Sequence, residues 1–222
     1  MQFEARIARD RSVTHDIVRE RVYGDVRVTA DWNDGIVTLD VSGEFDRRGA
    51  PAYVELFFHD VFLLLNLAAP GSFDGTIAIA GGELRVHDLT FHPFTGGADR
   101  LPIERVTAWF DSLQLGTRQV ASSGVETALF ELLHLARGAE NEEVSILRLA
   151  RAAEALLGRP ESLRRLFELR DEMAQGSTPV FHPMHDDALD PRIEDATREW
   201  IDVADAAASA IVRALQDRIE SR

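Results

Sequence analysis

The stretch from Leu156 to His185 decides how this chain is interpreted, and its sequence is LLGRPESLRRLFELRDEMAQGSTPVFHPMH. Within it, apolar residues recur at the spacing of a helix: Leu163, Leu166, Phe167 and Met173. Arg170 falls in the same stripe. A guanidinium keeps its charge, so it is costly to bury without partners. We therefore expect that its side chain either extends to the edge of the stripe or meets a polar cluster.

The best candidate partner for Arg170 is Glu154, which lies at the edge of the apolar face of the preceding helix. Two helices joined by a short turn pack antiparallel, so these two side chains are expected to meet. An arginine–glutamate pair of this kind has two interpretations. It satisfies both charges and only stabilises the fold, or it marks a binding site.

The chain beyond residue 97 has the period of helices. Apolar spacing predicts helices over residues 103–113, 123–136, 142–157, 160–176 and 190–215. Ser123 and Glu126 form a capping box, and Pro191 suits the first turn of the last helix. Gly158 and Gly176 are typical helix stops. These signals predict an all-α bundle of about four or five helices with short connections.

The first part of the chain alternates apolar and polar residues, which is typical of strands. The alternating segments cover residues 3–7, 26–32, 37–41, 77–79 and 84–86. Asn33-Asp34-Gly35 and Gly81-Gly82 are tight-turn signals and predict two hairpins. Pro51 opens an apolar helix over Tyr53–Ala69. These patterns predict a compact unit of strands with one packed helix.

The predicted fold class is therefore α+β, with a β-rich domain over residues 1–97 and a helical bundle over residues 98–222. Phe91–Arg100, which contains a proline and paired glycines, is the expected linker. Across this segment the period of the apolar pattern changes from that of strands to that of helices, and this change separates the two domains.

Composition and charge exclude several classes of chemistry. The chain contains no cysteine and no lysine, which excludes disulfides, thiolate metal sites, lysine Schiff bases and lysine-dependent phosphate loops. A net charge of -14 argues against a broad nucleic-acid surface, although a local basic pocket is compatible with it. The most apolar run carries Glu55, His59 and Asp60, so we expect a core helix there and no membrane span. We expect a cytoplasmic protein with no cofactor and no metal.

Four features together resemble a bacterial HEPN domain: AAEALLG at residues 152–158, LRRLFELRDEMAQG at residues 163–176, a Pro-Val-Phe-His-Pro loop and a long final helix. The closest branch is the ApeA-like group, which has an N-terminal β-rich domain. The resemblance covers Ser123–Ser221, and Arg170-Asp171 and Gly176 match the family motif. It implies a HEPN-like fold for the helical bundle.

In the HEPN family the motif arginine and histidine cleave RNA without a metal, often in toxins or antiviral effectors and usually as dimers. The position of the histidine is occupied here by Gln175, which cannot act as a general acid or base. The resemblance therefore implies a non-catalytic RNA-binding or protein-interaction module of a bacterial defence or toxin–antitoxin type system. Its expected binding residues are Glu154, Asp171 and Gln175, and its expected form is a homodimer.

Two alternatives remain open. In the first, the protein is a metal-independent ribonuclease in which Arg170 acts with His182 or His185 from the loop after its helix. In the second, it is a structural or oligomeric protein with no nucleic-acid role, and the Glu154–Arg170 pair only holds helices together. The alanine-rich segment of the last helix, at residues 206–210, packs either inside the bundle or against a second copy.

Overall fold

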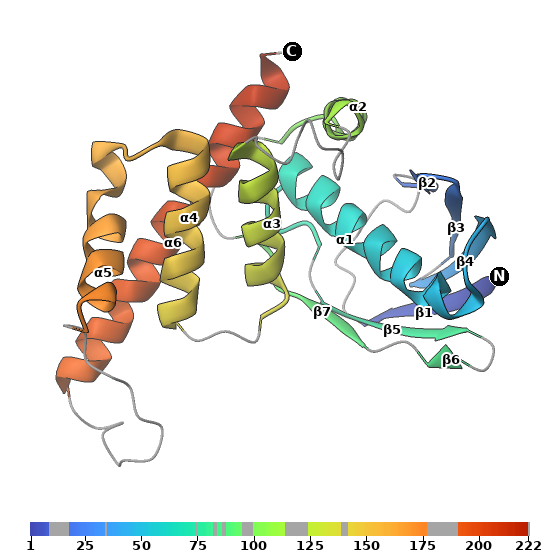
Figure 1. Ribbon diagram of the computed structural model, residues 1–222, viewed down its shortest axis with the longest axis horizontal. Helices are drawn as coiled ribbons and strands as arrows, with labels where there is room; N and C mark the ends of the chain where they lie inside the picture. The colour runs from blue at the N-terminus through green and yellow to red at the C-terminus, as the bar shows by residue number, and fades with distance from the viewer. Residues whose placement is uncertain are drawn as a thin grey trace. The chain divides into compact units, whose positions relative to one another are not determined.

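The computed structural model describes residues 1–8, 18–33, 35–73, 75–81, 84–85, 88–94, 100–113, 124–138, 142–176 and 191–221. The chain divides into two compact units (Figure 1). The first comprises Met1–Pro93, Asp99–Ala108 and Ala136–Gly138, and the second comprises Phe94–Ala98, Trp109–Leu135 and Ala139–Arg222. The predicted α+β class is confirmed, with strands in the N-terminal region and helices in the C-terminal region.

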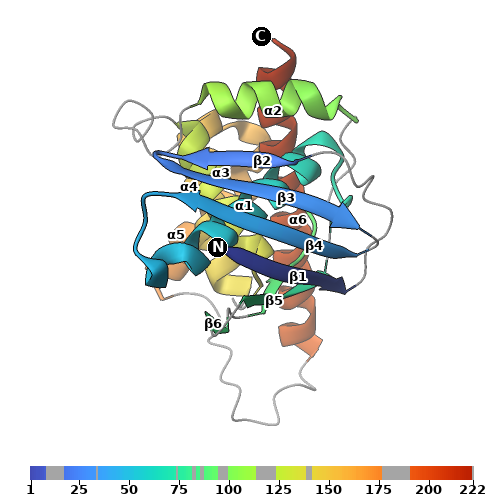
Figure 2. The ribbon, with the colours of Figure 1, turned by 90° about the vertical axis from the view of Figure 1, so that its right-hand side faces the viewer.

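The first unit is built on an antiparallel sheet. Its described strands are β1 (Gln2–Ala8), β2 (Glu20–Tyr23), β3 (Val26–Asn33), β4 (Ile36–Gly43), β5 (Gly75–Gly81), β6 (Leu84–Arg85) and β7 (Leu89–Phe91). Their order is β2-β3-β4-β1-β5, and both β6 and β7 pair with the remaining edge of β5 (Figure 2). The sequence pattern did not predict β2, which has two charged residues among its four, or β7, which ends at Phe91, where the linker was expected to begin.

Both predicted hairpins are confirmed. In the first, Asn33 faces Ile36 across a tight turn in which Gly35 has a φ of 77°, a conformation that favours glycine. In the second, Gly81 faces Leu84. The register of β3 and β4 places their alternating apolar residues on one face of the sheet, where these residues are buried.

The helix α1 (Ala50–Ala68) contacts β3 and β4. Pro51 lies in its first turn, as predicted, and the helix ends before Pro70. The buried side chain of Asn66 fixes the turn that follows. Its Nδ2 donates to the carbonyl oxygen of Phe73, and its Oδ1 accepts from the N–H of Gly71, both at 3.1 Å. Both ends of this buried amide are therefore satisfied, as buried polar groups require.

Among the described residues, α1 is the one helix that is long and apolar enough to cross a membrane by length and composition. However, 61% of its apolar window is buried inside the molecule. This degree of burial is typical of a core helix, which is what the charges of Glu55 and Asp60 predict.

A polar cluster fastens the edge strand β2 to α1. Arg21 Nε and the Tyr23 hydroxyl both donate to Asp60 Oδ2 at 2.9 Å, and the side chains of Arg21 and Asp60 are only 12% and 15% exposed. Burial, followed by the charge of Asp60, raises the pKa of Tyr23, so its phenol stays a neutral donor. Charge and hydrogen bonding thus hold a strand that is too short and too polar for apolar packing alone.

The second unit consists mainly of α3 (Gly124–Ala136), α4 (Glu142–Leu157), α5 (Arg164–Ala174) and α6 (Pro191–Glu220), while α2 (Ile103–Ser112) spans the division between the units. Short 3₁₀ turns, η1 (Arg47–Gly49) and η2 (Glu161–Leu163), precede α1 and α5. α4 contacts α5 and α6, and α5 contacts α6. These helices confirm the predicted ones, although the last continues to Glu220. The predicted caps Ser123 and Asp190 lie outside the described residues.

Close packing between β5 and β1 requires a glycine at position 81. A Cβ atom added to Gly81 would collide with the ring of Phe3, which is 2% exposed. We predict that Gly81→Ala lowers the free energy of unfolding by about 1–3 kcal/mol, because overpacking forces core side chains out of their preferred rotamers. Urea denaturation followed by circular dichroism measures this change. Gly49→Ala is the matched control, since a Cβ there meets nothing within 4 Å; equal losses in both variants would contradict the prediction.

Candidate functional site

The turn between α4 and α5 positions the candidate site. α4 ends at Leu157, and Gly158 follows with a φ of 75° while its N–H donates to the carbonyl oxygen of Glu154. The chain then passes through η2 and reverses into α5. The buried side of α5 and η2 contains the predicted apolar stripe: Leu163, Leu166, Phe167 and Met173. The stripe is therefore confirmed, and Leu169 adds to it.

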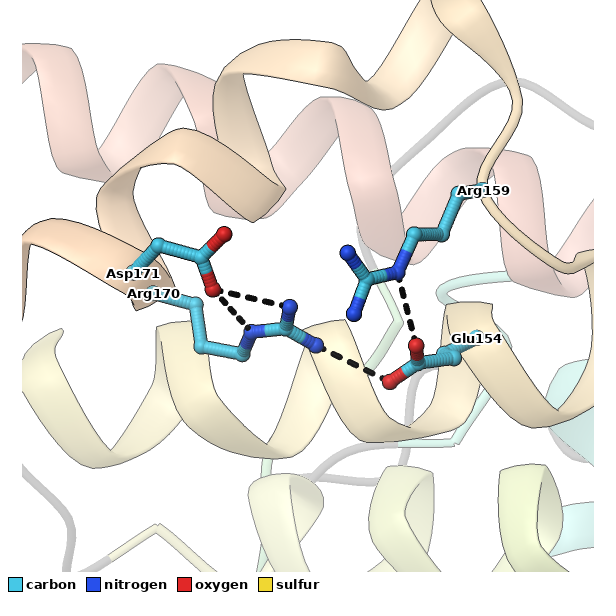
Figure 3. A network of polar contacts seen from close by, with 4 residues as sticks. All are labelled: Glu154, Arg159, Arg170 and Asp171. Atoms are coloured by element: carbon cyan, nitrogen blue, oxygen red, sulfur yellow. Dashed lines mark hydrogen bonds and ion pairs between the residues drawn. The ribbon is translucent and has the colours of Figure 1, made fainter. Parts of the chain in front are cut away.

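Arg170 lies at the edge of that apolar side, with 19% of its side chain exposed. Its Nε and Nη2 donate to Asp171 Oδ1 at 3.0 and 2.8 Å, and its Nη1 donates to Glu154 Oε2 at 2.9 Å (Figure 3). The predicted meeting of Glu154 and Arg170 is confirmed. Both expectations for Arg170 apply together, because the guanidinium reaches the edge of the stripe and is bound there by two carboxylates.

A second guanidinium shares Glu154. Arg159 Nε donates to Glu154 Oε1 at 2.7 Å, so each oxygen of this carboxylate binds a different arginine (Figure 3). The guanidinium carbons of Arg159 and Arg170 lie 5.5 and 5.4 Å from the centre of the Phe167 ring. Cations at such distances are attracted to an aromatic face. One carboxylate and one ring thus hold two cations together.

The charges of this cluster balance, since two arginines face two carboxylates. The hydrogen bond from Arg159, together with the charges of Arg159 and Arg170, holds the pKa of Glu154 below its ordinary value. The hydrogen bond to Asp171, together with the charges of both acids, raises the pKa of Arg170. Glu154 and Arg170 therefore stay ionised at neutral pH, and a carboxylate with a lowered pKa is a poor general base there.

The other predicted site residues differ in their relation to Arg170. Asp171 contacts it directly. The backbone N–H of Gln175 caps the end of α5, while its exposed side chain makes no hydrogen bond to Arg170 in the part of the chain that the structure describes. His182 and His185 lie outside the described residues. Across the described ranges, no group of three or more His, Cys, Asp or Glu is placed to hold a metal ion.

A second charged cluster, which the sequence pattern did not reveal to us, joins α3 to α4. Glu131 is only 1% exposed, and its two oxygens bind Arg148 Nη1 at 2.7 Å and Arg151 Nη1 at 3.1 Å. A signal was present, because Glu131 follows Ala128 at helical spacing and so shares the apolar face of α3. Arg159 gave no such signal, since it lies in a turn where no periodicity applies.

The geometry of both clusters suits binding or positioning, because guanidiniums and carboxylates that are hydrogen-bonded to one another hold their donors and acceptors in fixed places. No protein family, curated protein or solved structure matched this chain when it was compared with them. The HEPN assignment therefore stays a prediction, and the interpretation of the site rests on its residues and distances.

The two arginines that bind Glu131 are expected to differ in their contribution to stability. We predict that Arg148→Ala lowers the free energy of unfolding by about 1.5–3 kcal/mol, because it removes a hydrogen bond to a buried charge. Arg151 is 72% exposed, so Arg151→Ala should cost less than about 1 kcal/mol, as for surface pairs. Urea denaturation of both variants measures the difference. Equal costs would show that Glu131 does not depend on the less exposed partner.

Glu154 should make the stability of the second unit depend on pH. Its pKa is lowered by folding, so its contribution is fully present above the unfolded value of about 4.3 and is lost as pH falls through the lower folded value. We predict that Glu154→Gln is less stable than the wild type at pH near 7, and that this difference shrinks in acid. Thermal denaturation across pH measures both. Glu161→Gln, at a position that is 83% exposed, is the control, and a difference that is constant with pH would contradict this account.

Proposed function

We propose that this protein is a non-catalytic interaction module of a bacterial defence or toxin–antitoxin type system, cytoplasmic and with a HEPN-like helical bundle. One observation carries the proposal. All three nitrogens of the Arg170 guanidinium donate to Asp171 or Glu154. An arginine that stabilises a transition state needs donors aimed at the developing charge, whereas here they are aimed at the protein's own carboxylates.

Gln175 supports the same conclusion, because it occupies the position at which the HEPN family, which this chain resembles, has the motif histidine. Gln175 has no titratable proton, and its side chain is exposed at the end of α5. General acid–base catalysis requires a titrating group within hydrogen-bond reach of the reacting atoms. Glu154, which does reach Arg170, stays ionised at neutral pH and accepts from two arginines already.

A homodimer belongs to the same proposal. In the alanine-rich segment of α6, Ala207 is fully buried while Ala206 is exposed. One side of the segment is therefore used inside the molecule, and the other remains available to a second copy, since small side chains let helices approach closely. The β-rich unit would then recognise a ligand or a protein.

A second candidate function is a metal-independent ribonuclease that uses Arg170 with His182 or His185. The observation in its favour is the placement of Arg170 near the end of α5, from which the segment with both histidines continues. An imidazole titrates near neutral pH and can move the proton of a ribose hydroxyl. The two candidates differ in whether RNA survives contact with the protein.

The test is RNA integrity. Single-stranded and hairpin RNA are incubated with the wild-type chain, Arg170→Ala and His182→Ala in the presence of a metal chelator. We expect intact RNA in all three, because the described side chains that contact Arg170, those of Glu154, Asp171 and Phe167, include no imidazole. Arg164→Ala serves as the matched control, since Arg164 is an exposed arginine of the same helix. Cleavage by the wild type that is lost in both other variants, but kept in Arg164→Ala, would replace the proposal with the second candidate.

A further inference from the structure

We propose that Arg159 binds a single carboxylate from an acidic segment of a protein partner, beside the guanidinium of Arg170. This inference rests on the proposed function and adds the chemistry of the partner to it. It starts from the two guanidiniums that the α4–α5 turn brings to one aromatic ring.

Arg159 has the donors that such a ligand needs. A guanidinium carries five N–H groups in a planar fork, and among the described residues Arg159 donates only through Nε, to Glu154. Its side chain is 54% exposed. Its terminal nitrogens are directed toward the guanidinium of Arg170 (Figure 3). Arg170, by contrast, is 19% exposed and already donates through all three nitrogens.

The Arg159 fork is held in place before a ligand arrives. Glu154 binds its Nε at 2.7 Å, and the Phe167 ring lies 5.5 Å from its guanidinium carbon. An arginine that is already ordered loses less side-chain freedom on binding. Because Glu154 and Asp171 are each paired with an arginine, the cluster has no excess negative charge to repel an incoming carboxylate.

The site suits one carboxylate better than a nucleic-acid strand. The guanidinium fork matches a carboxylate with two parallel hydrogen bonds. A nucleic acid gains affinity by contacting many cations along its backbone. The neighbouring Arg164 and Arg165 are also paired with acids of their own helix, Glu168 and Glu172. A single open fork is enough for an acidic side chain of a protein.

The test uses the full chain labelled with ¹⁵N-arginine and two probes of matched charge, a hexaglutamate peptide and an oligouridylate. At physiological salt, we expect the peptide to shift the Arg159 Nε–H signal in NMR spectra in a saturable way. Arg159→Gln should weaken the peptide by about tenfold, the loss typical of one charge-assisted contact. Arg164→Gln, which removes a 68% exposed arginine from the neighbouring turn, is the matched control and should bind like the wild type.

Three outcomes would overturn the inference: no saturable shift, equal weakening in both variants, or tighter binding of the oligouridylate. Circular dichroism checks that both variants fold. If Arg159→Gln does not fold, Arg159→Lys replaces it and should also bind more weakly, because lysine keeps the charge and lacks the fork. Intact RNA without peptide binding would remove only this inference, whereas RNA cleavage would remove the proposed function whatever the peptide does.

Discussion

A charge that lies against apolar packing must be neutralised where it lies, and the second unit depends on this constraint. Glu131 is buried because Arg148 and Arg151 reach both of its oxygens. Arg170 can lie against the stripe of α5 because Glu154 and Asp171 bind it on two sides. Each cluster contains an ion pair between adjacent helices, Glu131 with Arg148 between α3 and α4 and Glu154 with Arg170 between α4 and α5, so contacts that satisfy charge also fix which helix faces which.

α4 is the helix on which both clusters converge. Three of its charged residues, Arg148, Arg151 and Glu154, are spaced by three, and each such step turns a side chain by about 60° around the helix. The first two therefore point toward α3, where they bind Glu131, and the third points toward α5, where it binds Arg170. A single run of sequence thus presents opposite charges to two neighbours, which discourages any other arrangement of the three helices.

The sequence allowed much of this to be predicted, for physical reasons that also set the limit. The Glu154–Arg170 pair was predictable because Glu154 lies at the edge of one apolar helix face and Arg170 lies in the apolar stripe of the next helix. A short turn makes these two helices antiparallel, so the two side chains meet. The partners of Glu131 were not, because the choice of Arg148 and Arg151 depends on the register between α3 and α4. Strand β2 was missed since its contact with α1 is made by a polar cluster, and polar residues leave no apolar period to detect.

The two arginines beside Phe167 differ in how exposed they are and in how many of their nitrogens already donate to the protein. Arg170, whose side chain is 19% exposed, donates to Asp171 and Glu154. Freeing these donors for a ligand would remove a hydrogen bond from each of the two carboxylates. Arg159, whose side chain is 54% exposed, is fixed through Nε, and among the described residues its two terminal nitrogens donate to no protein group. An exposed fork beside a satisfied one selects ligands by geometry, because the fixed charges around it already cancel.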